Sequence, residues 1–259
     1  MITFNLPLKV AAVAMGGLLV LIGSIFFPAY AQSVTKTLSV DDPAGIVLDP
    51  KGNVYVVETG KNRILEFNSN GTLITMWGSS GKGPGQFNSP IGITLDYVRG
   101  YVFVTDTGND RVQKFTSDGK FITMWGSSGK GPGQFQTPIG IDEDESKQNV
   151  YVTDIGNNRV ERFTSNGLFV AQWGSLGSGP GQFYNPTGMT VQYPQGNVFV
   201  ADTGNDRIQE FTSDGKFVNK WPINAPTGAT DNIDLDVNSN GIIYLTDRAS
   251  DQVLIISQK

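Results

Sequence analysis

Four tryptophans stand at a constant spacing of 48 residues along this chain, and no other feature constrains its fold as strongly. They are Trp77, Trp125, Trp173 and Trp221. The same spacing separates copies of an arginine (Arg63, Arg111, Arg159 and Arg207), a phenylalanine (Phe67, Phe115, Phe163 and Phe211) and a glycine (Gly71, Gly119, Gly167 and Gly215). A period in this range indicates a solenoid, a propeller or an array, so one structural unit recurs along the chain.

Each period contains four strand-length runs of β-branched and aromatic residues, bounded by Gly, Asn and Asp. In the second period the predicted strands are residues 91–95, 101–105, 111–115 and 121–125. Four antiparallel strands per repeat are typical of a propeller blade. We therefore predict an all-β fold, a β-propeller of five four-stranded blades.

The predicted blades cover residues 43–77, 90–125, 138–173, 186–221 and 226–259. The fifth blade has three predicted strands, the last at Val253–Ile256, and no fourth. The segment Val34–Val40, just before the first blade, is β-prone and belongs to no repeat. Because a propeller must cover its sheet edges, we predict that this segment closes the ring as the outer strand of the fifth blade.

The N-terminus has the pattern of an export signal. Lys9 precedes an apolar stretch, Val10–Phe27, and Ala29 and Ala31 fit the small-x-small rule for cleavage before Gln32. The stretch is also close to the shortest length that spans a membrane as a helix, so an uncleaved anchor at residues 10–27 is the alternative. We predict a signal peptide or membrane anchor at residues 1–31, a propeller domain at 32–259 and a secreted or extracytoplasmic location.

The second repeat resembles the NHL repeat. The resemblance is carried by GQF at 85–87, PIGI at 90–93 and VFVTDTGNDRVQKF at 102–115. Four near-complete copies and a divergent fifth extend it over residues 43–259. It implies a propeller that presents one face of loops to a protein, a glycan or a nucleic acid. NHL propellers usually have six blades, whereas this sequence contains five repeats.

The amino-acid composition excludes several kinds of catalysis and one class of partner. The chain has no cysteine and no histidine, which excludes disulfides, thiolate nucleophiles and histidine-based acid–base catalysis. Its net charge is −5 and no run of Lys or Arg is present, so we predict that it binds no nucleic acid. We therefore predict a protein or a glycan as the partner. We predict contact with a membrane only through an uncleaved anchor. A monomer is favoured over an oligomer.

Two repeated residue types invite a functional interpretation. Asp106 and Arg111 resemble a catalytic acid–base pair, but a single active site does not need a copy in each repeat, and an Asp and an Arg on adjacent strands can brace a turn. The tryptophans could form a glycan-stacking platform. Their common place at the end of an outer strand favours packing between blades instead. We predict a structural role for both sets.

Acidic residues mark the places where the repeat is broken near the predicted seam of the ring. Asp41 and Asp42 precede the first blade, and the fifth blade carries an insertion at residues 229–232 that includes Asp231 and Asn232 and is followed by Asp234. Ring closure would bring both segments to the same face in neighbouring blades. These five residues therefore form a predicted site for a hard cation such as Ca²⁺. The alternative is a set of solvated loop carboxylates with no cofactor.

A second acidic run, Asp142-Glu143-Asp144-Glu145, occurs in the third repeat. The strand pattern places it at a hairpin turn on the opposite face of the propeller. Four adjacent like charges predict a solvated turn that favours solubility, with a cation-mediated contact as the alternative.

The leading function hypothesis is an extracytoplasmic NHL-repeat propeller that serves as a scaffold for a protein or a glycan, with no catalytic residue. The alternative is a divalent-metal-dependent hydrolase or lyase that resembles the gluconolactonase group, with its site at the channel mouth. The similar amidating and streptogramin lyases rely on histidine, which this chain lacks. Carboxylates, Lys or Tyr would have to do the acid–base work, and no motif for this is visible.

Overall fold

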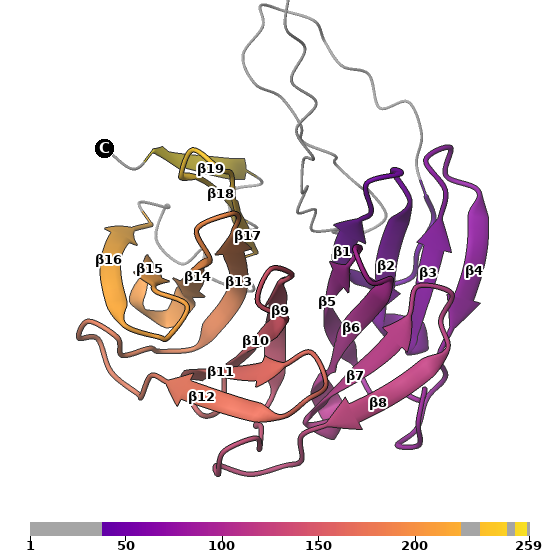
Figure 1. Cartoon of the computed structure of the whole chain (residues 1–259), viewed down its shortest axis with the longest axis horizontal. Coiled ribbons are helices and arrows are strands. Elements are labelled where there is room, and N and C mark those ends of the chain that lie inside the picture. Colours follow the sequence, from indigo (N-terminus) through magenta and orange to yellow (C-terminus); the bar gives the residue numbers. More distant parts are fainter. Residues whose placement is uncertain (1–37, 224–233, 248–251, 258–259) are drawn as a thin grey trace, which may run out of the picture.

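Five antiparallel sheets are arranged as blades around a central axis (Figure 1). The computed structural model describes residues 38–223, 234–247 and 252–257. Within these ranges four sheets have four strands and the fifth has three, and every sheet pairs its strands in sequence order. The first strands of successive blades lie beside one another near the axis. This confirms the predicted all-β propeller of five blades.

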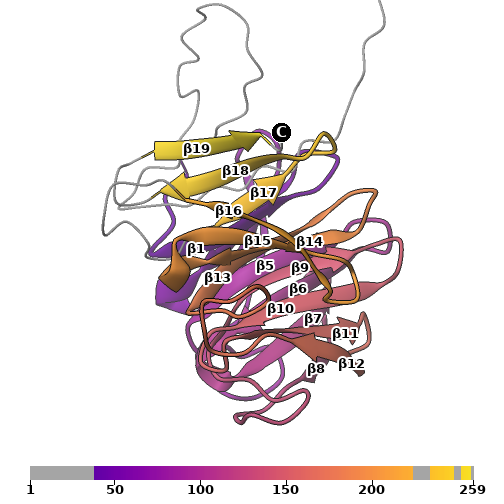
Figure 2. The same cartoon turned by 90° about the vertical axis from the view of Figure 1, so that its left-hand side faces the viewer.

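The first blade consists of β1 (Pro43–Leu48), β2 (Val54–Glu58), β3 (Arg63–Phe67) and β4 (Leu73–Trp77). The second consists of β5 (Pro90–Asp96), β6 (Tyr101–Asp106), β7 (Arg111–Thr116) and β8 (Phe121–Trp125). The third consists of β9 (Pro138–Asp144), β10 (Asn149–Asp154), β11 (Arg159–Thr164) and β12 (Phe169–Trp173). The fourth consists of β13 (Pro186–Gln192), β14 (Asn197–Asp202), β15 (Arg207–Phe211) and β16 (Phe217–Pro222). The fifth contains β17 (Leu235–Val237), β18 (Ile242–Asp247) and β19 (Gln252–Ser257), and packs against the fourth (Figure 2).

Because neighbouring strands run in opposite directions, the connections fall on two faces of the ring. We call one the turn face; it carries the hairpin turns that leave the first and third strands of each blade. The other, the connector face, carries the short turns between the second and third strands and the long connectors between blades at residues 78–89, 126–137 and 174–185.

The short turns on the connector face follow from the local sequence. After β6 the chain makes one turn of 3-10 helix, Thr107–Asn109, and Asp110 then adopts φ 52° to enter β7. Asn62, Asn158 and Asp206 occupy the same conformation in the other blades. Asn and Asp tolerate this left-handed region better than other side chains, because their short polar groups can bond locally.

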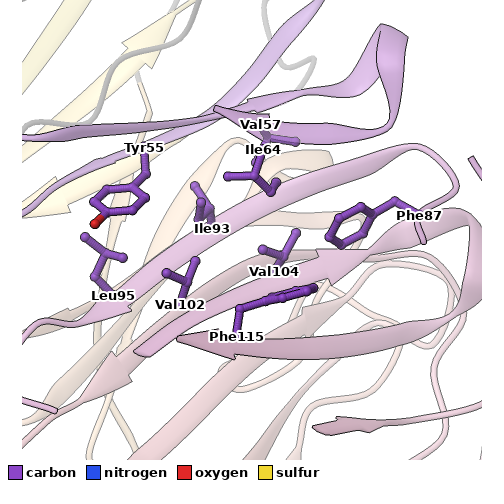
Figure 3. Close-up of a cluster of buried hydrophobic side chains, with 9 residues drawn as sticks. All are labelled: Tyr55, Val57, Ile64, Phe87, Ile93, Leu95, Val102, Val104 and Phe115. Carbon is purple, nitrogen blue, oxygen red and sulfur yellow. The ribbon is translucent and has the colours of Figure 1, made fainter. Parts of the chain in front are cut away.

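The core lies between the blades. Alternating side chains of the middle strands point to opposite faces of each sheet, and both faces are covered by a neighbouring blade, so β6 is buried from Val102 to Asp106. Figure 3 shows the layer between the first two blades, where Tyr55, Val57 and Ile64 meet Ile93, Leu95, Val102, Val104 and Phe115.

The repeated tryptophans belong to these layers. Trp77 contacts Phe115 of the next blade with ring centroids 6.0 Å apart, and Trp125 contacts Phe163 at 5.9 Å. Trp173 repeats the contact with Phe211 at 6.0 Å. The predicted role in packing between blades is confirmed for these three residues.

The chain enters the first blade in the way that a connector enters the other blades. Asp42 and Ser89 stand directly before the first and second blades, and their φ values are 47° and 49°. The backbone N of Asp41 donates to Glu58 at 2.9 Å, as the backbone N of Asn88 donates to Asp106 at 2.7 Å. Asp41 and Asp42 therefore take the last two positions of a connector.

The predicted closing strand Val34–Val40 lies partly outside the described residues. Its described part, residues 38–40, belongs to no strand, and Leu38 and Val40 pack against the face of the first blade that the second blade does not cover. The pairing with β19 stays a prediction. Within the described ranges no helix is long and apolar enough to cross a membrane, and residues 1–31 lie outside those ranges.

Candidate functional site

Asp106 is the centre of a polar cluster that holds the connector in front of the second blade. Its buried carboxylate accepts hydrogen bonds of 2.7–3.0 Å from Arg111 Nε, Gln113 Nε2, Asn109 Nδ2 and the backbone N of Asn88. Arg111 in turn donates, over 2.7–3.0 Å, to the backbone carbonyls of Lys82, Gly83 and Gln86. The donors of the cluster are thus used to fix the path of the Gly-rich connector.

The same cluster recurs in the fourth blade. Asp202 Oδ2 accepts from Arg207 Nε at 2.6 Å and from Gln209 Nε2 at 2.9 Å, and Arg207 binds three connector carbonyls. In the first blade Glu58 and Arg63 form the corresponding pair. Because the pairs of the second and fourth blades bind their connectors through the same atoms, the structural interpretation of Asp106 and Arg111 is confirmed.

The third blade departs from this arrangement at one residue. Glu161 stands where the second and fourth blades have Gln113 and Gln209, and a carboxylate has no N–H to donate to Asp154. Arg159 bonds to Glu161 instead, and its Nε lies 3.4 Å from Asp154 Oδ2. Burial raises the pKa of Glu161 to about 7, against the lowering effects of a backbone hydrogen bond from Gly133 and of Arg159.

The expectation of a solvated acidic turn in the third blade is wrong for three of its four residues. Asp142, Glu143 and Asp144 belong to strand β9 and are 6%, 3% and 5% exposed, and only Glu145 lies in the turn, half-buried. The strand register requires this, because Asp142 occupies the position of Thr94 and Thr190 in the neighbouring inner strands. A carboxylate can be buried in a strand, despite its preference for water, when neighbouring groups donate hydrogen bonds to it.

Asp142 receives such hydrogen bonds from the blades on both sides. Its Oδ1 accepts from Thr94 Oγ1 at 2.8 Å, and its Oδ2 accepts from the backbone N of Val191 at 2.8 Å and from Thr190 Oγ1 at 3.1 Å. It therefore ties three inner strands together at the axis. Burial, and after it the carboxylates of Asp236 and Asp142, raises the pKa of Asp234 to about 7.

The residues predicted to hold a cation fall in different surroundings. Asp41 and Asp42 are exposed at the start of the first blade, with Asp41 Oδ2 3.7 Å from Lys61 Nζ. Asp234 is half-buried, and the carboxylates that act on it are Asp236 and Asp142. Asp231 and Asn232 lie outside the described residues. The cation site at these positions stays a prediction.

A different acidic group satisfies the spacing of a metal site. One carboxylate oxygen each from Asp96, Glu143 and Glu145 lies within 4.8 Å of the others, at the turn-face ends of the second and third inner strands. Arg99 already supplies a cation there, because its Nη1 lies 3.0 Å from Asp96 Oδ2 and 3.2 Å from the carbonyl oxygen of Glu145. A guanidinium of the chain thus already pairs with one of the three carboxylates, that of Asp96.

A pocket on the turn face was missed by the sequence reasoning. It lies where the turns of the second, third and fourth blades meet, and its lining includes Tyr97, Glu143, Glu145 and Tyr193. Both tyrosines are exposed. The available signal was their spacing, since Tyr97, Glu145 and Tyr193 are successive copies of one repeat position.

Comparisons with known proteins agree with this architecture. Radial antiparallel sheets with repeated inter-blade layers define the class of β-propellers. A family model described as a 6-bladed beta-propeller matches residues 90–163, and a model of the NHL repeat matches residues 183–211. The chain is a β-propeller that contains an NHL repeat at residues 183–211, and the resemblance of its sequence to the NHL repeat is confirmed.

Two curated relatives are both named NHL repeat-containing protein 3. The mouse protein is 31% identical over 88 residues, which is 33% of this chain and 24% of the mouse protein. The human protein is 28% identical over 72 residues, which is 27% of this chain and 21% of the human protein. The match therefore spans about a quarter of the mouse relative and a fifth of the human one.

Solved structures share the fold at low sequence identity. A catalytically inactive virginiamycin B lyase from Staphylococcus aureus with quinupristin has a TM-score of 0.65 and 16% identity, covering 97% of this chain and 74% of that one. A chain in a nidogen/laminin complex has a TM-score of 0.70 and 19% identity, covering 96% of this chain and 89% of that one. At these identities the likeness shows the fold alone.

Proposed function

We propose that this chain works outside the cytoplasm as a monomeric scaffold that binds a protein or a glycan through the loops on one face of the propeller. One observation carries the proposal. The polar residues that resemble catalytic groups, Asp106 and Arg111 with their copies, are hydrogen-bonded to connector backbone. Such clusters make loops rigid, and rigid loops on a fixed frame are suited to binding because little conformational entropy is lost on association.

The export half of this proposal rests on residues 1–31 and has its own test. A reporter enzyme that is active only outside the cytoplasm is fused after Lys259. The fusion is expected to be active, and removal of residues 1–31 is expected to abolish the activity. A full-chain fusion that is produced but inactive, with its protein in the cytoplasm, would overturn the extracytoplasmic location.

The binding half is tested by cross-linking in the source cells, followed by reconstitution with the purified partner. The proposal expects a saturable complex with one partner, measured as a dissociation constant. A parallel screen on immobilised glycans covers the second partner class. A chain that forms neither complex, but turns over a lactone or a related substrate, would overturn the scaffold proposal.

A metal-dependent hydrolase or lyase is the second candidate, because carboxylates gather at the axis. Burial, and after it the carboxylates of Asp236 and Asp142, raises the pKa of Asp234 there to about 7. A group that titrates near neutral pH can serve as a general base. A structural neighbour described as a catalytically inactive lyase carries a histidine-to-alanine change, and this chain has no histidine. Turnover that is lost with a chelating agent and in Asp234→Asn would favour this candidate.

A further inference from the structure

The pocket on the turn face is formed by three consecutive blades. Tyr97 contributes from the turn after β5, Glu143 and Glu145 from the end of β9 and its turn, and Gln192 and Tyr193 from the end of β13. Backbone hydrogen bonds fix the turns on either side. The backbone N of Arg99 donates to Asp96 at 2.9 Å, and the backbone N of Gly196 donates to the carbonyl of Gln192 at 2.7 Å.

The two tyrosines are not part of the core. Tyr97 is 43% exposed and Tyr193 is 70% exposed, whereas the aromatic residues between the blades, such as Phe103, are fully buried. Exposed rings on rigid turns beside a pocket are typical anchors of binding sites, because they supply a large contact area at a low entropic cost.

The polar lining consists mainly of acceptors. Glu143, Asp144 and Glu145 line the pocket, and no Lys or Arg is among its lining residues. The one amide in the lining, Gln192, directs its Nε2 to the carbonyl of Asn238 at 3.1 Å. An ionised carboxylate only accepts hydrogen bonds, whereas Lys and Arg side chains only donate them. The three carboxylates of this lining therefore match the N–H donors of a cationic group.

A cation of the chain itself already lies against the wall of the pocket. Lys147 Nζ is 3.4 Å from Asp144 Oδ2, and it is so close to Gly196 that a β-carbon added there would come within 2.8 Å of it. Gly196 also lines the pocket. The surroundings therefore accommodate an ammonium group beside Asp144 and Gly196, at the wall of the pocket.

We infer that this pocket binds a Lys or Arg side chain from a basic segment of a protein partner. The carboxylates of β9 and its turn attract the cation, and the rings of Tyr97 and Tyr193 contact it through their faces or cover its aliphatic part. The net charge of −5 adds a long-range attraction for a basic partner. This inference rests on the proposed scaffold function and names its partner class.

Fluorescence anisotropy of a labelled hexa-arginine peptide with the purified full chain tests the inference. Tyr193→Ala and Glu145→Gln are each expected to weaken binding by about fivefold, since a single cation–π or charged contact has roughly that effect. Asp118→Asn is the matched control. It removes the same charge from an exposed carboxylate in the outer turn of the second blade, where Asp118 pairs with Lys120 at 3.0 Å, and it is expected to change binding by less than about twofold.

Any one of four outcomes would overturn the inference. The first is a loss of binding in Asp118→Asn as large as that in Glu145→Gln, which would indicate attraction by net charge alone. The second is binding of the peptide to Tyr193→Ala as tight as to the unaltered chain. The third is Tyr193-dependent binding of a neutral oligosaccharide such as maltoheptaose while the peptide does not bind. If a cross-linked partner binds Tyr193→Ala unchanged, the pocket assignment fails while the scaffold function stands.

Discussion

Trp125 of the second blade lies directly over Gly167 of the third blade, so closely that a β-carbon at Gly167 would come within 2.7 Å of the indole ring. Because Gly167, in the turn before β12, has no side chain, Trp125 can pack against Phe163 of the next blade. Trp77 with Gly119 and Trp173 with Gly215 repeat the relationship at 2.7 Å and 2.5 Å. The Trp and Gly copies share the spacing of 48 residues in the sequence because they contact each other between successive blades.

Gly167→Ala is expected to destabilise the protein by about 3 kcal/mol, because it adds a clash with Trp125 to the strain of a positive φ. Gly181→Ala is the matched control. Its φ is +74°, close to the +83° of Gly167, but no heavy atom lies within 4 Å of the added carbon. It should cost only about 1 kcal/mol. Equal losses in urea unfolding would contradict an inter-blade role for the contact.

Glu161→Gln is expected to stabilise the protein near neutral pH. The folded-state pKa of Glu161 is raised to about 7 from 4.5, so ionisation opposes folding. The penalty is absent below the unfolded pKa, grows as the pH rises from about 4.5 to about 7, and is complete above that. At about pH 8 the free energy of unfolding of the variant should therefore be higher by about 1–3 kcal/mol, which appears as a higher melting temperature. At about pH 4 both should change little.

Gln113→Glu is the matched reverse change. It installs in the second blade the carboxylate that the third blade carries, so it should lower stability at about pH 8 more than at about pH 4. A pH-independent effect of either variant would show that ionisation of this position does not act on folding.

The spacing of 48 residues was sufficient to predict the blades, because each repeat carries its own strand pattern and turn residues. The buried carboxylates of β9 could not be predicted from residue type, since Asp142 is held by partners from the second and fourth blades. The repeat register did contain the signal, as Thr94 and Thr190 are strand residues at the same position. The pocket could not be predicted from the sequence, because it depends on the curvature of the propeller, which brings Tyr97 and Tyr193 into the lining of one pocket.

The cation site at the ring seam predicts a response of stability to Ca²⁺. A chelating agent should lower the melting temperature and excess Ca²⁺ should restore it, because an ion that binds only the folded ring stabilises it by mass action. At one hundred times the dissociation constant the gain is about 2.7 kcal/mol. Asp231→Ala should abolish the response. A melting curve indifferent to both additions would contradict the cation site and leave Asp41 and Asp42 as solvated loop carboxylates.

Nucleic acid is expected not to bind. The chain carries 19 basic and 24 acidic residues and no basic run, so phosphate contacts would not be compensated. Anisotropy with labelled RNA and duplex DNA in about 150 mM salt should show no saturable binding. A dissociation constant in the micromolar range would contradict the expectation.

The stability of Asp106→Asn tests most directly whether the repeated polar clusters are framework or active site. Asp106 is fully buried and is the counter-ion of Arg111, which is 7% exposed. We expect a loss of about 3 kcal/mol in unfolding free energy, because the change leaves a buried guanidinium without its partner. Catalytic residues are commonly strained, and their replacement tends to leave stability unchanged or higher. An unchanged or raised melting temperature for Asp106→Asn, measured by calorimetry, would contradict the account.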